Sequence, residues 1–323
     1  MFSTLTIINI SCYFWTGLTL ISLNLPISYV ILKNKELRVR YGLLLSLFIT
    51  CALAGLIGFS KSVYRIVVIF PINDGNGAVI NKLLCLFNPI MICDIYTFSA
   101  VAVMLLFTTI DRLLVVVIPV RYFLHSRRIV FWELAVSHLF TLSVLIIALI
   151  VCTIGAKGTT TVECRQSSYL PSSVYTWLVC MRALFSGMSV MVMGIVLIML
   201  KWRTNDSTAF LLDKKLAIFK RNQRSFTRLM IASCAVTLLL DVVPNCISLY
   251  AHLMQLPDVD NYTTYTRYIT YLNDMNLVLV TSIRQKEIRE EILYRVRIIC
   301  RMLCCFKRSS DSPELSFVRR SPK

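Results

Sequence analysis

The stretch VFWELAVSHLFTLSVLIIALIVCTI, residues 130–154, decides the class of fold. It carries one formally charged residue, Glu133, and it is longer than the roughly 20 apolar residues that an α-helix needs to cross a bilayer. Six further runs of similar character occur along the chain. They cover residues 7–32, 41–64, 83–110, 174–200, 227–253 and 262–283. Because backbone polar groups in lipid must be satisfied within their own segment, these runs predict membrane-spanning helices.

The composition of the whole chain agrees with a membrane protein. Of its 323 residues, 57% are hydrophobic and only 16% are charged, and the mean hydropathy is +0.70. Soluble chains usually carry about a quarter charged residues. The net charge of +17 would also fit a nucleic-acid-binding protein, but no segment combines a soluble fold with a basic face. We therefore expect no nucleic-acid partner, and we attribute the basic residues to membrane topology.

The distribution of Lys and Arg predicts that topology. The run 262–283 is the weakest candidate, since it contains Arg267, Asn273 and Asp274, and hydropathy alone could leave it out. Of the 34 Lys and Arg residues, however, 26 follow the first, third, fifth and seventh runs. The positive-inside rule makes those segments cytoplasmic. The N-terminus is then outside and the C-terminus inside, which requires an odd number of spans.

These observations predict an all-α membrane protein with three parts. Residues 1–283 form a seven-transmembrane helix bundle. Residues 284–305 form a short amphipathic helix that lies on the cytoplasmic membrane lipid, because apolar residues recur there at spacings of three and four among arginines. Its end carries candidate palmitoylation sites, Cys300, Cys304 and Cys305. Residues 306–323 are expected to be a disordered cytoplasmic tail, open to phosphorylation.

The same topology sorts the remaining cysteines and the glycosylation motifs. Cys85 and Cys164 both fall on the outer side, where an oxidising environment allows a disulfide. The acceptor motifs at Asn9 and Asn261 are also outside, whereas the motif at Asn205 falls in a cytoplasmic loop. We therefore predict a Cys85–Cys164 bond and glycans on Asn9 or Asn261.

Charged residues inside the spans indicate where a ligand could bind. Asp94 lies 18 residues before Arg112, five helical turns or about 27 Å, and so on the same helix face near the outer end. Lys61 and Arg182 are the cations that compete for it. Together, Asp94, Lys61 and Arg182 predict a small-molecule pocket in the outer half of the bundle. Because two cations face one carboxylate, an acidic ligand is slightly favoured over an amine. Alternatively, Asp94 forms an internal ion pair with one of the two cations, and these residues bind no ligand.

The stretch FTTIDRLLVVVIPVRY, residues 107–122, ends the third run and begins the following basic loop. Here the chain resembles the rhodopsin-like G-protein-coupled receptors, and it looks most like the nematode serpentine chemosensory receptors. From the residues alone, Arg112 could simply anchor the helix end at the membrane boundary. The resemblance implies instead that Asp111 holds Arg112 in a resting pair. It also implies that Arg112, with Asp111 and the loop residue Pro119, then couples to a heterotrimeric G protein.

Two further positions resemble the same family in its sixth and seventh helices. Pro244 corresponds to the family's kink proline, and a proline bends a helix because it removes a backbone hydrogen bond. Asn276 corresponds to the asparagine of the family's Asn-Pro-x-x-Tyr segment, although Leu277 and Val280 replace its proline and tyrosine. The resemblance implies that Pro244 and Asn276 form an activation hinge.

Together these features predict a G-protein-coupled receptor, chemosensory in function, in the plasma membrane, with the cilium of a sensory cell as a candidate location. Its expected partners are a small-molecule ligand, a heterotrimeric G protein and membrane lipid. A transporter or channel is the alternative class, but the sequence contains no internal repeat. A neuropeptide receptor also stays open, since the second outer loop is long. No clustered catalytic, cofactor-binding or metal-binding residues are found, so an enzyme is not expected.

Overall fold

The computed structural model describes residues 4–69, 79–155, 158–205, 234–256, 259–284 and 288–294. Most of these residues are helical. The long helices are α1 (Thr4–Lys33), α3 (Gly42–Ile69), α5 (Pro89–Val117), α6 (Pro119–Gly155), α8 (Ser172–Asn205), α10 (Val243–Leu253) and α11 (Val259–Arg284). The shorter elements are α2 (Lys35–Arg40), α4 (Lys82–Leu86), α7 (Gln166–Tyr169), a π-helical turn (Leu238–Val242), β1 (Val79–Asn81) and β2 (Thr159–Thr161).

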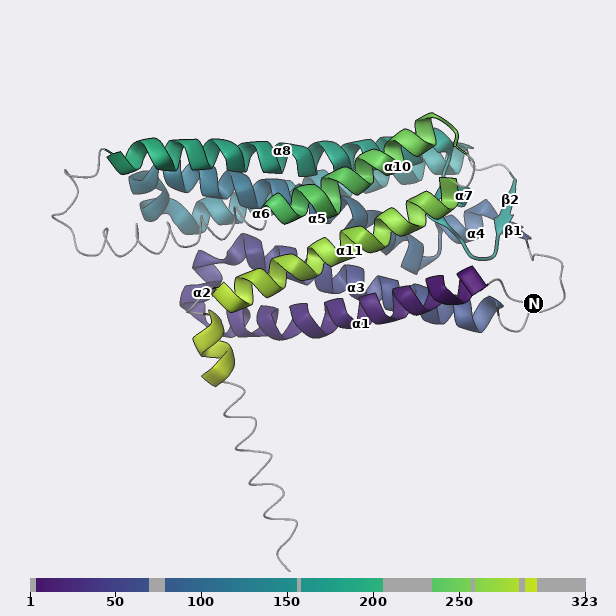
Figure 1. Cartoon of the computed structure of the whole chain (residues 1–323), viewed down its shortest axis with the longest axis horizontal. Coiled ribbons are helices and arrows are strands. Elements are labelled where there is room, and N and C mark those ends of the chain that lie inside the picture. The colour runs from purple at the N-terminus through teal and green to yellow at the C-terminus, as the bar shows by residue number, and fades with distance from the viewer. Residues whose placement is uncertain are drawn as a thin grey trace, which may run out of the picture.

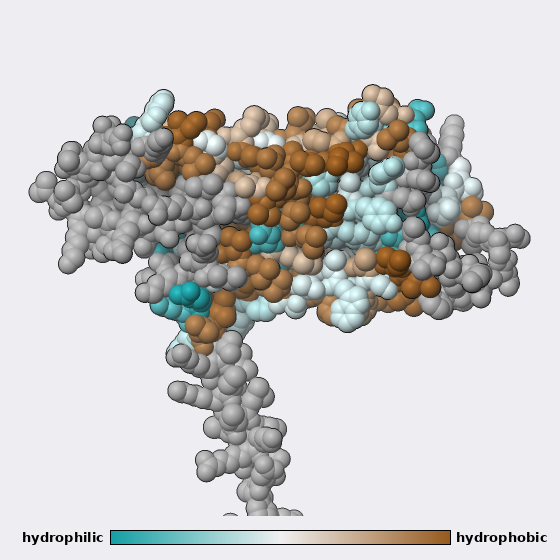
Figure 2. Space-filling view, viewed as in Figure 1, coloured by the Kyte–Doolittle hydropathy of each residue, from teal (hydrophilic) through white to brown (hydrophobic). Residues whose placement is uncertain are grey.

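Six of the described helical segments are long and apolar enough to cross a membrane. They lie in α1, α3, α5, α6, α8 and the segment Cys234–Leu253. Their outward side chains fit a lipid environment: on α6, Leu139 is 66% exposed and Ile154 is 76% exposed. Figure 2 shows apolar side chains across the middle of one face. The chain is therefore an all-α, multi-pass membrane protein, in which α11 is a 26-residue helix of more polar composition.

The helices form an elongated bundle with two distinct ends (Figure 1). At one end, here called the hairpin end, lie α4, α7 and the antiparallel pair β1–β2, together with the start of α1. At the other, here called the α2 end, lie α2 and the last turns of α11. Within the bundle α1 packs along α3, and α11 contacts both α1 and α10. The weak seventh run therefore forms a helix that packs as part of the bundle.

The tightest packing occurs where α1 crosses α3. A Cβ atom added to Gly17 would lie 2.6 Å from the carbonyl oxygen of Gly55 and 2.6 Å from the backbone nitrogen of Phe59. A Cβ atom added to Gly55 would lie 2.6 Å from Cβ of Leu20. Small residues at such a crossing let two membrane helices approach closely, because lipid gives no hydrophobic drive for their association.

Two expected boundaries are wrong. The run 83–110 is not one helix: α4 ends at Leu86 and α5 starts at Pro89, because the side chain of Asn88 accepts a hydrogen bond from the backbone N–H of Ile90 and caps the new helix. The expected cytoplasmic loop after residue 110 is also helical. Helix α5 continues to Val117, and α6 begins at Pro119 with a kink at His125.

Parts of three other predictions fall outside the described residues. The sixth run is described only from residue 234, and the amphipathic segment 284–305 only at Arg284 and at 288–294, which are helical. The candidate palmitoylation sites and the tail 306–323 lie outside the described part of the chain.

Candidate functional site

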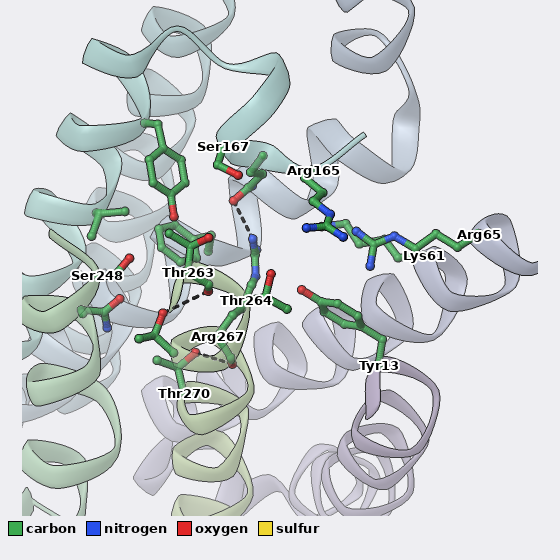
Figure 3. A pocket seen from close by; sticks show the side chains of 16 residues that line it. Tyr13, Lys61, Arg65, Arg165, Ser167, Ser248, Thr263, Thr264, Arg267 and Thr270 are labelled. Atoms are coloured by element: carbon green, nitrogen blue, oxygen red, sulfur yellow. Dashed lines mark hydrogen bonds between the residues drawn. The ribbon is translucent and has the colours of Figure 1, made fainter. Parts of the chain in front are cut away.

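A pocket opens at the hairpin end of the bundle, between α1, α3, α5, α8, α10, α11 and the start of α7 (Figure 3). Its cavity is small, about 40 Å³, and it continues into an open mouth. Four cationic side chains line it, from Lys61, Arg65, Arg165 and Arg267, and none of the described lining residues is Asp or Glu. The pocket wall is therefore strongly positive.

Asp94 lies buried behind this wall and pairs with two of its cations. Lys61 Nζ donates to one carboxylate oxygen of Asp94, and Arg267 Nη2 lies 2.7 Å from the other. These pairs join α3, α5 and α11. The alternative of an internal ion pair between Asp94 and Lys61 is thus what the structure contains, and Asp94 is a positioning residue behind the pocket.

Arg267 also contacts the segment that follows the disulfide. Its Nη1 donates to the Gln166 side-chain oxygen at 2.6 Å, at the start of α7. Cys85 and Cys164 form a disulfide, as predicted, and this bond fixes the α7 segment to α4. Burial raises the pKa of the Tyr169 phenol in α7 well above its ordinary value, so this group stays neutral.

Arg182 belongs to a second network, deeper in the bundle. Its guanidinium pairs with Asp241 in the π-helical turn, with Nη2 2.9 Å from Oδ1. The other carboxylate oxygen accepts a hydrogen bond of 2.5 Å from Ser186, and Asn245 Nδ2 donates to Oδ1 at 2.9 Å. Arg182 therefore does not pair with Asp94 and does not line the pocket, because Asp241 neutralises it within the core.

Phe98 connects the two networks. Its ring lies 4.6 Å from Cζ of Arg182 and 5.0 Å from Cζ of Arg267, and its backbone oxygen accepts from Arg182 Nη1 at 3.2 Å. Both guanidinium groups thus contact the negative face of one aromatic ring.

The α2 end holds the Asp-Arg sequence. Asp111 is buried, and its Oδ2 lies 3.1 Å from Arg112 Nη2. The Tyr122 hydroxyl in α6 donates to Asp111 Oδ1 at 2.5 Å. Pro119, expected in a loop, is instead the first residue of α6. The pairing that the family resemblance implies is therefore geometrically present, with Tyr122 as a further partner that the sequence did not indicate.

The predicted hinge residues lie in irregular or incompletely bonded surroundings. Pro244 is the second residue of α10, which follows the π-helical turn, as expected for a residue that cannot donate a backbone hydrogen bond. Asn276 in α11 has a buried side-chain nitrogen without a hydrogen-bond partner among the described residues. Nearby, Thr237 donates to the Asn273 side chain at 3.0 Å and joins the helix before the π turn to α11.

The two predicted glycosylation sites differ. Asn9 is only 5% exposed in α1, and its backbone oxygen accepts a hydrogen bond of 2.9 Å from the hydroxyl of Tyr268 in α11. This arrangement disfavours a glycan on Asn9, since helix packing covers it. Asn261 lies in the first turn of α11, and its side chain is outside the described part of the structure.

The sequence reasoning identified only Lys61 among the cations that line the pocket. Arg65 follows Lys61 by four residues, a spacing that puts both on one helix face and would have indicated a shared site. For Arg267, the sequence indicates only that a charged residue lowers the hydropathy of the seventh run. Arg165 follows the disulfide cysteine directly and pairs with Glu163 at 2.5 Å, a local contact without a distinctive sequence signal.

The chain matches no protein-family model, and no curated protein is significantly similar to it. The described features that bear on function are the pocket at the hairpin end and the Asp111–Arg112–Tyr122 cluster at the α2 end.

Proposed function

We propose that the chain is a seven-helix receptor of the plasma membrane, which transmits the binding of a small extracellular ligand to a heterotrimeric G protein. The observation that carries this proposal is the position of two polar sites at opposite ends of the helix bundle. The charged pocket lies at the hairpin end, and the Asp111–Arg112–Tyr122 cluster lies at the α2 end. Such a layout suits a protein that links events on two sides of a membrane.

Charge and redox chemistry support the orientation that we propose. The hairpin end carries the disulfide, which is stable in an oxidising compartment, and the basic segment 33–40 lies at the α2 end. We infer that the hairpin end is outside and that α11 is the seventh span. Its buried polar groups contact other helices, as the Arg267–Asp94 and Thr237–Asn273 pairs illustrate.

The bundle also contains an element through which binding could act. Helix α5 carries Asp94 behind the pocket wall and Arg112 close to its other end. The π-helical turn before Pro244 interrupts the regular backbone hydrogen bonding of its helix, so the helix bends more easily there. A ligand that favours one arrangement of this turn shifts the population of a signalling state only by its difference in affinity for the two states.

Two measurements test this proposal. Antibody should reach an N-terminal tag on intact cells and a C-terminal tag only after permeabilisation. In cells with a second-messenger reporter, wild-type chain should give a response to a broad panel of metabolites and odorants, and Arg112→Ala should abolish it at equal surface expression. Surface detection of the C-terminal tag would end the seven-span assignment, and normal signalling by Arg112→Ala would remove the coupling role.

A transporter of anions is the second candidate, and the cationic wall of the pocket is the observation that favours it. Ionisable groups within a membrane bundle also mark transport pathways. Uptake of a labelled pocket ligand into cells or vesicles, without a second-messenger response, would support transport instead of signalling.

A further inference from the structure

The charges around the pocket do not balance. Lys61, Arg65 and Arg267 contribute three positive groups, and Asp94 contributes one negative group that contacts the first and the last of them. Arg165 has its own partner, Glu163. Within the described part of the chain, the three cations and one carboxylate leave two positive charges without a counter-charge.

Arg65 forms no ion pair with a residue that the structure describes. Its side chain is only 7% exposed, and its Nε is buried with no hydrogen-bond partner among the described residues. Its guanidinium carbon lies 5.1 Å from the centroid of the Tyr13 ring. A buried guanidinium that lacks an anion is costly, and a bound anion would remove that cost.

The other groups that line the pocket indicate what kind of molecule carries the anionic group. In Figure 3, Lys61, Arg65 and Arg165 lie on one side of the pocket, Ser248 and Thr263 on the other, and Arg267 between them. Hydroxyl-bearing residues from α10 and α11 contribute much of the remaining wall. A wall of this kind suits a hydrophilic molecule better than a fatty acid, because hydroxyl groups that face a hydrocarbon chain lose hydrogen bonds to water.

We propose that this pocket binds a small hydrophilic organic acid, whose carboxylate is held by Arg65 beside Lys61. This inference rests on the proposed receptor function and names the chemical class of its ligand. A guanidinium can hold a carboxylate with two parallel hydrogen bonds. An amine ligand is disfavoured, since it would enter a space lined by four cations, and the Asp94 carboxylate behind the wall already binds two of them.

The test measures binding directly, so that it does not depend on signalling. The full-length chain, purified in lipid nanodiscs, is heated with lactate, succinate or nicotinate and, in parallel, with lactamide, succinamide or nicotinamide, and with choline as a cation. At least one acid should raise the unfolding temperature, and its neutral amide and choline should not. If no acid stabilises the protein, or if an amide or choline stabilises it equally, the proposal is overturned.

Variants locate the site. Arg65→Gln should weaken binding of the stabilising acid on the order of tenfold to a hundredfold, the worth of a charge-assisted hydrogen bond. Arg65→Lys should lie between Arg65→Gln and wild type, because it keeps the charge but loses the planar fork. Lys82→Gln is the matched control: it removes one cation at the same end, outside the pocket wall, and should bind as wild type does.

The outcomes separate this inference from the proposed function. Unchanged acid binding in both folded Arg65 variants would overturn the inference, and so would equal weakening in Lys82→Gln, because a general surface charge effect would explain it. If Arg65→Gln does not fold, Arg65→Lys decides by its affinity. Acid binding that depends on Arg65, without any second-messenger response, would support the anion site and reject the receptor function. A second-messenger response to amines alone would support the receptor function and reject the anion site.

Discussion

Arg182 in α8 and Asp241 in the π-helical turn, 59 residues apart in sequence, form a buried ion pair with Nη2 2.9 Å from Oδ1. Asp241 is fully buried. This pair, and not a contact between Arg182 and Asp94, holds α8 to the turn that precedes Pro244. The geometry gives Arg182 a structural role, in contrast to the ligand contact expected from its place inside a span.

The first prediction concerns this pair. Arg182→Gln or Asp241→Asn should each destabilise the folded protein by about 3–5 kcal/mol, because either change leaves a buried charge without its partner. Thermal unfolding of the purified protein and surface expression in cells measure the effect. Ser186→Ala, which removes only one hydrogen bond to Asp241, is the graded control and should cost about 1–3 kcal/mol.

The double exchange Arg182→Asp with Asp241→Arg should recover part of the lost expression, since it restores opposite charges at the same two positions. Wild-type stability of either single variant would contradict the structural role of the pair.

The second prediction concerns the crossing of α1 and α3. Gly17→Ala should destabilise the protein by about 1–3 kcal/mol, because the new methyl group would press on the backbone of α3 at 2.6 Å and force the helices apart. Gly194→Ala on α8 is the control: an added Cβ there meets no heavy atom within 4 Å, and alanine favours a helix. Similar unfolding temperatures for the two variants would contradict this account of the crossing.

The long helices could be predicted from the sequence because an apolar run of more than 20 residues has few alternatives in a membrane protein. Even the weak run 262–283 forms a helix, α11, in which Asp274 is buried and the side chain of Arg267 is 12% exposed. The break before Pro89 was missed because the apolar run continues across it, although Asn88 followed by proline is a helix-start signal. The helical continuation through Val117 was missed because a basic loop was expected from charge alone.

The pocket was less predictable than the fold. Lys61 and Asp94 were identified as ionisable groups in spans, and they do lie together, but their partner Arg267 comes from a helix 173 residues further along the chain than Asp94. Which cation meets which carboxylate depends on how each helix is rotated and packed, and hydropathy carries no information on that. The assignment of Arg182 to the pocket failed for this reason.

The third prediction concerns the disulfide. It closes a loop of 79 residues, for which the chain-entropy model gives about 4 kcal/mol, and it anchors the α7 segment that contacts Arg267. Cys85→Ser and Cys164→Ser should therefore lower thermal stability to a similar degree, and the double variant should be no worse than either. Cys93→Ser, at a free and exposed cysteine, is the control and should behave as wild type.

Thiol labelling provides an independent check on this bond. A membrane-impermeant maleimide should not react with Cys85 or Cys164 in native protein and should react with both after reduction. Labelling of the two cysteines without reduction would contradict the disulfide.

The last prediction concerns the Asp111–Arg112–Tyr122 cluster and rests on the proposed receptor function. Tyr122 donates to one oxygen of Asp111 while Arg112 contacts the other, so the hydroxyl helps to hold the carboxylate in place for the arginine. Tyr122→Phe removes this hydrogen bond and keeps the ring, and Asp111→Asn removes the negative charge. Both variants should raise ligand-independent second-messenger production, with the larger rise for Asp111→Asn, because each weakens the pairing that restrains Arg112.

Tyr250→Phe, at an exposed tyrosine of α10, controls for loss of a hydroxyl as such. The double variant Tyr122→Phe with Arg112→Ala should have no basal activity, since the freed group is then absent. Basal activity that stays at the wild-type level in both single variants at equal surface expression would show that the pair anchors the helix end without restraining signalling.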